Sequence, residues 1–402
     1  MTDEIHTQTP RAVHPKQNWW KVAFMVLLGI CVLGTVYYAG TQVGTLQQQP
    51  FPLNKTKAEE DKKVDAEIPE EKTENTNIFY VEDNALLSYD LTTKQKKTWI
   101  PKPTGTTNLV SYKGLRLIDD TTLGFGRCST KTGDFGCALY VLDLTNGEET
   151  KVKGLDTKTL LDSLDFFTSK TYAYLAVTDT AWQLFISDDG TVSTLEDLPQ
   201  SLGGRGGFLE DSNMMRFSPD GKSLMHISTS SPRDSTDFTV HFYDLSTGKK
   251  KVLDNATQPS WLDNTHIVYR NYSGSESGGL YLYDLNTQET TKVSGSTKSS
   301  YHPEVLKGTN KVLSYEYDPK EVRIYDLEKN TQTAIATQTI SGFWVTPNVV
   351  AYTKTKPCTD ECMGPIDYTP VSLATYDLSS QKEGAVLPID ATSFYLSATL
   401  YH

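Results

Sequence analysis

The sequence has no basic stretch that could bind a phosphate backbone. Its 402 residues include 38 Lys and Arg against 50 Asp and Glu, which gives a formal net charge of −12. Lys and Arg stand only in segments of mixed charge, whereas nucleic-acid-binding domains concentrate cations on one face. The charge balance therefore argues against a nucleic-acid partner, and it would help to keep an exported domain soluble.

The usual catalytic signatures are missing as well. Residues 274–278 (GSESG) have the glycines of a G-x-S-x-G nucleophile elbow, but Glu276 stands at the nucleophile position. The segment 221–223 (GKS) lacks the upstream glycine of a phosphate-binding loop. We therefore predict no catalytic residue and no cofactor-binding residue.

Metal-binding patterns are equally scarce. The seven histidines show no paired spacing, and His226, His241 and His266 are predicted strand residues with a structural role. Asp234 and Asp237 lie in one polar loop, but the glycine and the closing glutamate of an EF-hand loop are absent. We predict no metal site.

One long run, residues 22–43, contains no charged side chain. As a helix with a rise of about 1.5 Å per residue it would extend about 33 Å, enough to cross the hydrocarbon core of a membrane. Trp19 and Trp20 precede the run and Tyr37 and Tyr38 lie near its end, as in the aromatic belts of membrane helices. The run predicts a transmembrane helix.

The charge distribution orients this helix. Lysine and arginine precede it and are absent from the residues that directly follow it. The positive-inside rule then places residues 1–21 in the cytoplasm and the chain after residue 43 outside. A cleaved signal peptide would put a tyrosine where a small residue is required, and a lipoprotein signal ending at Cys31 would have the bulky Ile30 before it. We expect an uncleaved, single-pass anchor in the cell membrane.

Residues 44–76 are rich in charge and contain almost no large apolar residues. Such a segment cannot bury a core, so we expect a disordered stalk, with a short solvated helix as the alternative. The remaining residues, 77–402, form the predicted extracytoplasmic domain.

This domain contains a repeat. An alternating apolar run ends at an aspartate, and a short polar turn and a second strand follow. The repeat aspartates are Asp90, Asp143, Asp188, Asp244, Asp284, Asp326 and Asp377. They are 40 to 56 residues apart, and a period of this size made of strands and turns is typical of propeller blades. The carboxylate of each aspartate can accept a hydrogen bond from the backbone two residues on and so begin a turn.

A second strand pair precedes several of these hairpins. The clearest is in residues 214–228, where the turn FSPDGK lies at 217–222; residues 259–270, 304–317 and 342–353 have a similar pattern. Two strand pairs make a four-stranded blade. The SPDG turn and the Tyr-Asp strand ends resemble the repeats of TolB-like and WD-repeat-like propellers. The resemblance implies an all-β propeller over residues 77–402.

Closure of the ring predicts seven blades. The domain begins with three strands, and residues 391–402 form a single further strand-like run that could complete the first blade. A shared blade of this kind removes the open edges of the ring. The alternative is a six-bladed ring in which the weak hairpin around Asp188 is an insertion.

Four of the five cysteines form two close pairs, Cys128 with Cys137 and Cys358 with Cys362, while Cys31 lies in the apolar run. Locally paired cysteines in an exported domain predict two disulfides. Reduced thiols in a cytosolic protein are one alternative. A four-thiolate zinc site is another, but the pairs fall in blades two and seven, too far apart for bonds of about 2.3 Å.

The predicted loops are unequal on the two rims of the ring. The hairpins at the repeat aspartates are short, whereas the connections on the other rim are long; these are 127–137, 199–213, 229–238, 271–279 and 353–371. Long loops on a rigid scaffold often carry binding sites, although they can also be tolerated insertions. The predicted binding residues on this rim are Arg205, Phe208, Arg233, Tyr272 and Asp360.

Three functions fit these features. The first is a membrane-anchored scaffold that binds a protein or a cell-envelope polymer through the long-loop rim. The second is a glycosidase-like enzyme with carboxylates near the central channel. The third is a structural subunit of a cell-envelope assembly. We favour the first and expect no cofactor, which leaves open whether the chain is an enzyme.

Overall fold

The computed structural model describes residues 76–104, 109–131, 134–155, 160–177, 182–198, 215–229, 238–272, 278–357, 368–388 and 394–395. The chain divides into two compact units, Met1–Glu70 and Glu71–His402, and all described residues belong to the second. The predicted cytoplasmic segment, the transmembrane helix and residues 44–75 of the stalk lie outside this part of the chain. Within it, no helix is long and apolar enough to cross a membrane.

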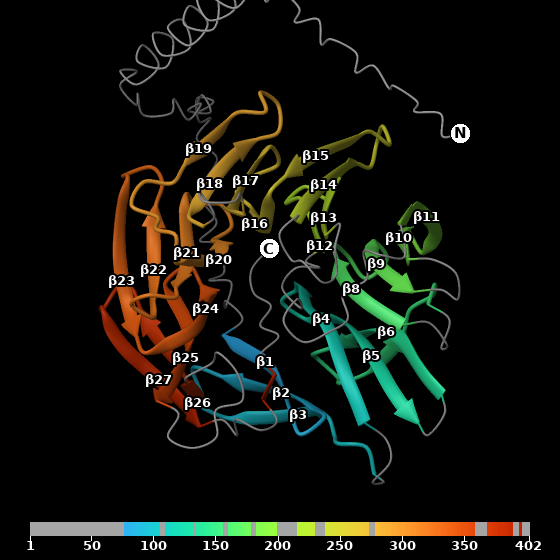
Figure 1. Ribbon diagram of the computed structural model, residues 1–402. Helices are drawn as coiled ribbons and strands as arrows, with labels where there is room; N and C mark the ends of the chain where they lie inside the picture. Colours follow the sequence, from blue (N-terminus) through green and yellow to red (C-terminus); the bar gives the residue numbers. More distant parts are fainter. Residues whose placement is uncertain are drawn as a thin grey trace, which may run out of the picture. The chain divides into compact units, whose positions relative to one another are not determined.

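The described residues form seven four-stranded antiparallel sheets, which stand around a common axis as seven blades (Figure 1). Blade 1 contains β28 (Phe394–Tyr395), β1 (Asn77–Glu82), β2 (Ala85–Asp90) and β3 (Lys96–Ile100). Blade 2 contains β4 (Leu109–Asp119), β5 (Thr122–Lys131), β6 (Asp134–Asp143) and β7 (Glu149–Lys151). Blade 3 contains β8 (Leu160–Phe166), β9 (Tyr172–Val177), β10 (Trp182–Asp188) and β11 (Thr191–Leu198).

Blades 4 to 7 continue the same order, from the innermost strand outward. Blade 4 contains β12 (Met215–Phe217), β13 (Ser223–Thr229), β14 (Phe238–Asp244) and β15 (Lys250–Asp254). Blade 5 contains β16 (Ala256–Trp261), β17 (His266–Asn271), β18 (Leu280–Asp284) and β19 (Thr290–Lys292). Blade 6 contains β20 (Ser300–Val305), β21 (Lys311–Glu316), β22 (Glu321–Asp326) and β23 (Thr331–Thr337). Blade 7 contains β24 (Thr339–Thr346), β25 (Val349–Pro357), β26 (Tyr368–Asp377) and β27 (Lys382–Pro388).

The seven-bladed prediction is confirmed, and the six-bladed alternative is wrong. The weak hairpin around Asp188 is the outer half of a complete blade, because β8 and β9 pair with each other and β9 pairs with β10. A sequence without the aromatic-Asp strand end of its neighbours can still form a blade, since the consecutive buried residues of β9 supply its core.

The two ends of the domain meet in blade 1. Strand β28 pairs with β1, with Val81 opposite Tyr395 and Glu82 opposite Phe394. The predicted closure is therefore confirmed at these two residues, and the rest of the run 391–402 lies outside the described part of the chain. The pairing covers the free edge that β1 would otherwise present.

Each third strand of a blade ends at its repeat aspartate, as the sequence predicts. The carboxylate of Asp90 accepts a hydrogen bond from the Thr92 N–H at 2.7 Å, and that of Asp244 accepts one from the Ser246 N–H at 3.0 Å. Gly248 follows in the same hairpin with φ of 67°, a conformation that costs glycine little. These turns set the length of the third strand and so bring the fourth strand into register.

The hydrophobic core consists of seven clusters, each shared by two adjacent blades. The cluster that closes the ring joins Ile78 and Tyr80 of blade 1 with Phe343 and Val345 of blade 7. No blade therefore buries both of its faces alone, and side-by-side packing supplies the missing partner.

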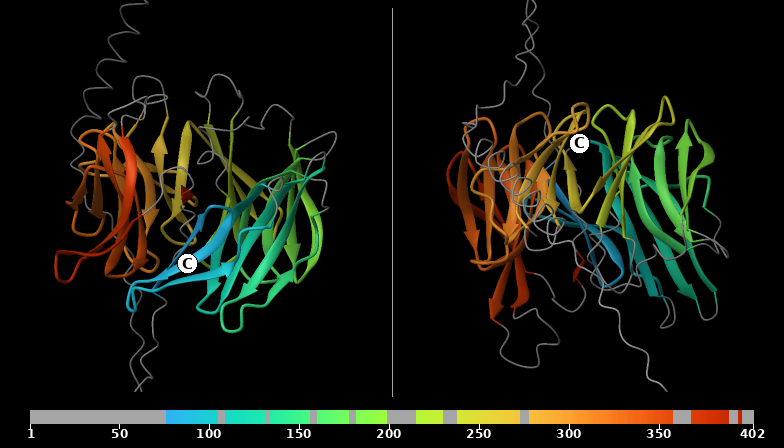
Figure 2. Two further views of the ribbon diagram at one scale, coloured as in Figure 1. Left: turned by 90° about the horizontal axis from the view of Figure 1, so that it is seen from below. Right: turned by 45° about the horizontal axis from the view of Figure 1, so that its top comes forward.

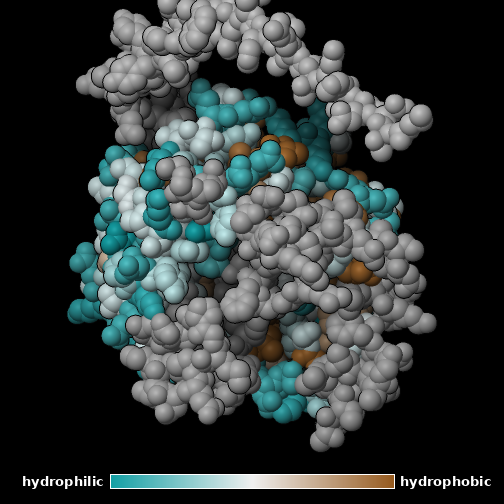
Figure 3. Space-filling view, viewed as in Figure 1, coloured by the Kyte–Doolittle hydropathy of each residue, from teal (hydrophilic) through white to brown (hydrophobic). Residues whose placement is uncertain are grey.

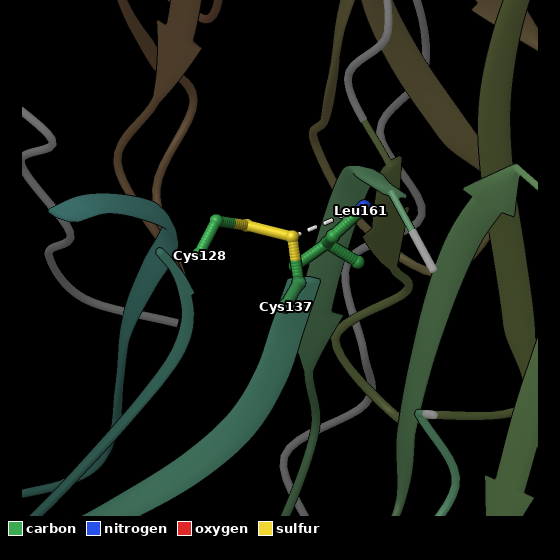
Figure 4. The surroundings of a disulfide bond; sticks show 3 residues. All are labelled: Cys128, Cys137 and Leu161. Carbon is green, nitrogen blue, oxygen red and sulfur yellow. Dashed lines mark hydrogen bonds between the residues drawn. A yellow bond between two sulfur atoms is a disulfide. The ribbon is translucent and has the colours of Figure 1, made fainter. Parts of the chain in front are cut away.

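The predicted loop at 127–137 needs correction. Strands β5 and β6 extend through this region, and Cys128 lies directly opposite Cys137 in their pairing. The predicted disulfide between them is present, but it links two strands rather than the ends of a loop (Figure 4). Both cysteines are buried against blade 3, where the Leu161 N–H lies 3.3 Å from Cys137 Sγ. The second predicted pair, Cys358 and Cys362, lies outside the described residues.

Candidate functional site

The strands run between two rims of the ring, which Figure 2 shows from the side. The loop rim carries the connections between the second and third strands of each blade and between successive blades. The turn rim carries the remaining hairpins, including those at the repeat aspartates. The sequence predicts the binding residues on the loop rim.

Of these residues, only Tyr272 lies in the described part of the chain. It directly follows β17, and its N–H donates to the Asn255 carbonyl at 2.7 Å, which fixes the backbone where the chain leaves the blade. The other four, Arg205, Phe208, Arg233 and Asp360, lie outside the described residues.

Tyr272 belongs to a row of aromatic and cationic side chains on the loop rim of blades 4, 5 and 6. We call it the rim row; it consists of Phe238, Arg270, Tyr272, Tyr301, Tyr317 and Lys320. Tyr272 meets Phe238 edge to face, with ring centroids 5.0 Å apart. The Arg270 guanidinium lies 5.3 Å from the centre of the Tyr272 ring and 3.9 Å from that of Tyr301. The row therefore crosses from blade 4 to blade 6 through one arginine.

The row continues outward from Tyr301. The Tyr317 ring centroid lies 6.3 Å from that of Tyr301, and the Lys320 ammonium lies 5.6 Å from the centre of the Tyr317 ring. Tyr317 is 48% exposed, and it is one of only two large apolar side chains in the described chain with that degree of exposure. The row thus has a buried base and an exposed end.

Arg270 is the buried base of the row. It is 6% exposed, and its Nε has no hydrogen-bond partner among the described residues. Burial lowers the pKa of Arg270, while the tyrosines Tyr301 and Tyr272 act in the opposite direction. Stacking between two rings is a common way to hold a guanidinium away from water. The same contacts fix the orientation of the two tyrosines.

Irregular backbone lies beside the row on the innermost strands. Gln258 of β16 and His302 of β20 both have positive φ, at 52° and 50°, and both lie at shifts in strand register. The His302 N–H donates to Gln258 Oε1 at 3.0 Å. Positive φ at residues other than glycine is uncommon and gathers at functional sites. The pair thus ties blades 5 and 6 together beside the rim row.

Charged residues also lie on the innermost strands, where the glycosidase-like alternative would place its catalytic carboxylates. Asp165 on β8 is fully buried. Burial is the largest influence on Glu304 of β20 and raises its pKa to about 8, although the charges of Arg216 and Arg116 oppose the shift. Among the described residues, no group of three or more His, Cys, Asp or Glu could hold a metal ion.

Sequence reasoning missed most of the rim row. Arg270 and Tyr317 lie in segments that the sequence identifies only as strand pairs, and Tyr301 lies outside every predicted strand pair. The connection that contains Tyr317 is short, so a search for long loops passes over it. The alternation in SYEYD does leave Tyr317 at the end of a strand, which is the only signal that could have indicated it.

No family model matches the chain, and a search of curated proteins gives no match. Among solved structures, puromycin hydrolase is similar over 78% of this chain and 52% of its own, with 12% identity and a TM-score of 0.54. An oligogalacturonate lyase from Vibrio parahaemolyticus is similar over 78% and 84%, with 13% identity and a TM-score of 0.50. TolB from Acinetobacter baumannii is similar over 78% of each chain, with 14% identity and a TM-score of 0.46.

At these identities the similarities concern the fold alone. They show that the described domain shares its fold with the matched parts of the puromycin hydrolase and of the oligogalacturonate lyase. The described domain is an all-β propeller with seven blades, the fold that the resemblance to TolB-like propellers implies.

Proposed function

We propose that the chain is a membrane-anchored, extracytoplasmic propeller that binds a protein or a cell-envelope polymer through its loop rim. The observation that carries this proposal is the rim row. Tyrosine and arginine are enriched among the residues that dominate binding interfaces. The row combines an exposed tyrosine with a rigid buried arginine, so little side-chain freedom is lost when a partner binds.

The surface of the described chain supports recognition by individual side chains. On the face seen in Figure 3, the hydrophobic residues of the described chain lie in small separate groups among hydrophilic ones. A partner would therefore contact single aromatic rings and charged groups rather than one broad apolar patch. Tyrosine suits this role because its ring is apolar and its hydroxyl can form hydrogen bonds.

The second candidate is a propeller-scaffold enzyme, and Glu304 is the observation that favours it. A carboxyl group with its pKa raised to about 8 can act as a general acid near neutral pH. Its position on an innermost strand fits a site near the ring axis. A glycosidase-like enzyme needs a second carboxylate. Asp165, the fully buried carboxylate on another innermost strand, is already engaged, because it accepts a hydrogen bond from the Phe217 N–H at 2.8 Å and contacts Arg116.

A binding experiment with rim variants tests the leading proposal. The purified chain is incubated with insoluble cell-wall polymer and, separately, with extracted envelope proteins, and bound protein is measured. We expect Tyr317→Ala to weaken binding by about 2 kcal/mol or more, while its melting temperature stays close to that of the wild type because the residue is 48% exposed.

Val252→Ala is the matched control, because Val252 is 47% exposed and lies on β15, outside the rim row. Lys249→Ala, in the hairpin of blade 4 on the turn rim, is a second control. If Tyr317→Ala binds as well as the wild type and either control variant loses binding, the rim row is not the binding site. Release of soluble products from the polymer, abolished by Glu304→Gln, would favour the enzyme instead.

A further inference from the structure

Besides Lys113, Asp119 and Asp162, the innermost strands carry four charged side chains, on four different blades, that interact electrostatically with one another. They are Arg116 on β4, Asp165 on β8, Arg216 on β12 and Glu304 on β20. The innermost strands of a propeller surround its axis. Arg116 and Asp165 are 5% and 0% exposed, so these charges are held in a region with little water.

One carboxylate is shared by two arginines. Asp165 Oδ1 lies 3.2 Å from Arg116 Nε and 4.0 Å from Arg216 Nη1, while its Oδ2 accepts a hydrogen bond from the Phe217 N–H at 2.8 Å. The Arg116 contact is an ion pair without the alignment of a hydrogen bond. Within the described chain, Arg116 Nε has no hydrogen-bond partner, although an unsatisfied buried donor is costly.

Within the interacting group, the cations Arg116, Arg216 and Lys307 outnumber the carboxyl groups of Asp165 and Glu304. Burial lowers the pKa of Arg116 to about 9, against the charge of Asp165, and the guanidinium therefore stays charged at neutral pH. Lys307, just after β20, adds a third cation whose pKa is lowered by burial and by Arg116. Glu304 could balance these charges, but its pKa of about 8 leaves it mostly protonated at pH 7.

We propose that Arg116 and Arg216, with Lys307 close by, form an anion-binding site at the ring axis that takes a carboxylate or phosphate group. The anion would supply the negative charge that protonated Glu304 lacks, and it would accept a hydrogen bond from Arg116 Nε–H. Guanidinium groups bind both kinds of oxyanion in this way. The site lies on the innermost strands and does not depend on the function proposed for the rim row.

Titrations with inorganic phosphate and with acetate test the site. The purified full chain is titrated with each salt, with sodium chloride at equal ionic strength as reference, and heat release and melting temperature are recorded. We expect saturable binding of at least one anion and a rise in melting temperature. Phosphate binding alone would indicate a phosphate ligand, and acetate binding alone would indicate a carboxylate.

Arg216→Gln is the main variant, since its side chain is 28% exposed and its loss disturbs the core less than that of Arg116. We expect at least about tenfold weaker anion binding. Lys222→Gln is the matched control, because this cation is also in blade 4 but its side chain is 77% exposed in the turn after β12. Equal binding by both variants would overturn the proposal.

The pH dependence gives an independent readout. Glu304 faces Arg116 from β4, Arg216 from β12 and the Trp344 backbone of β24. Above its pKa of about 8, Glu304 becomes a competing anion, so affinity should fall about fourfold between pH 7 and pH 8.5. In Glu304→Gln this fall should largely disappear. A wild type without saturable binding, or an identical pH profile in wild type and Glu304→Gln, would contradict the site.

Discussion

Two buried histidines show how single residues set the conditions under which the ring is stable. His226 and His241 lie opposite each other on β13 and β14, and Ser228 Oγ lies 2.6 Å from His241 Nε2. Neither ring nitrogen of His226 has a hydrogen-bond partner in the described part of the chain. The pKa of His226 is lowered to about 3 and that of His241 to about 4; burial is the largest cause for both, and the charge of Lys250 acts in the same direction. Both rings are therefore neutral in the folded state.

These shifts predict a loss of stability in mild acid. The unfolded chain takes up protons near the ordinary histidine pKa of 6.5, whereas the folded chain does not until the pH is much lower. The two histidines should therefore contribute almost no pH dependence to the free energy of unfolding above pH 7. As the pH drops from 6.5 towards 4, the free energy of unfolding should fall by up to about 1.4 kcal/mol per pH unit for each ring.

Urea unfolding of the wild type and of His226→Leu between pH 4 and pH 8 measures this effect. We expect the variant to lose stability less steeply below pH 6.5, while the two proteins should show the same pH dependence above pH 7. Parallel curves over the whole range would mean that His226 takes up a proton without unfolding.

At the scale of strands and loops, the repeat aspartates carried most of the predictive information. An aspartate that begins a turn acts locally, because its carboxylate accepts hydrogen bonds from backbone N–H groups two residues on, as at Asp90 and Asp244. Its position in the sequence therefore marks the end of the strand directly. Loop length was a weaker guide. The segment at Cys128 and Cys137 was predicted as a loop but forms a strand pair, because glycine and cysteine do not prevent a ladder of backbone hydrogen bonds.

The candidate site depended on contacts that the sequence does not display. Arg270 and Tyr301 belong to different blades and meet only because β17 and β20 are neighbours in the ring. The ion pair of Arg116 and Asp165 likewise joins two blades. Only Tyr272 was predicted, because it lies beside a long loop.

Removal of strand β28 tests the closure of the ring. Deletion of residues 391–402 should expose the edge of β1 and weaken the cluster between blades 1 and 7. We expect the melting temperature to fall by at least about 5 °C and aggregation to increase. Deletion of residues 396–402 alone keeps β28 and should have a much smaller effect. Equal melting temperatures for the wild type and the longer deletion would show that this pairing contributes nothing to closure.

At the scale of the whole molecule, the ring is a rigid support for the proposed binding rim. Seven interfaces close it, so a row of side chains spread over three blades can keep a fixed geometry. The proposed anchor and stalk would hold this rim outside the membrane. The central claim is therefore that the loop rim is outside the cell and is occupied by a partner there.

Cysteine labelling in intact cells tests this claim most directly. Asp318→Cys places a thiol on the loop rim directly beside Tyr317 and leaves the rim row intact, and Lys249→Cys places one on the turn rim; both are treated with a membrane-impermeant maleimide. We predict that Lys249→Cys is labelled in intact cells, whereas Asp318→Cys is protected in cells and labelled in the purified protein. Labelling of both only after lysis would contradict the outside location, and equal labelling of both in intact cells would contradict an occupied loop rim.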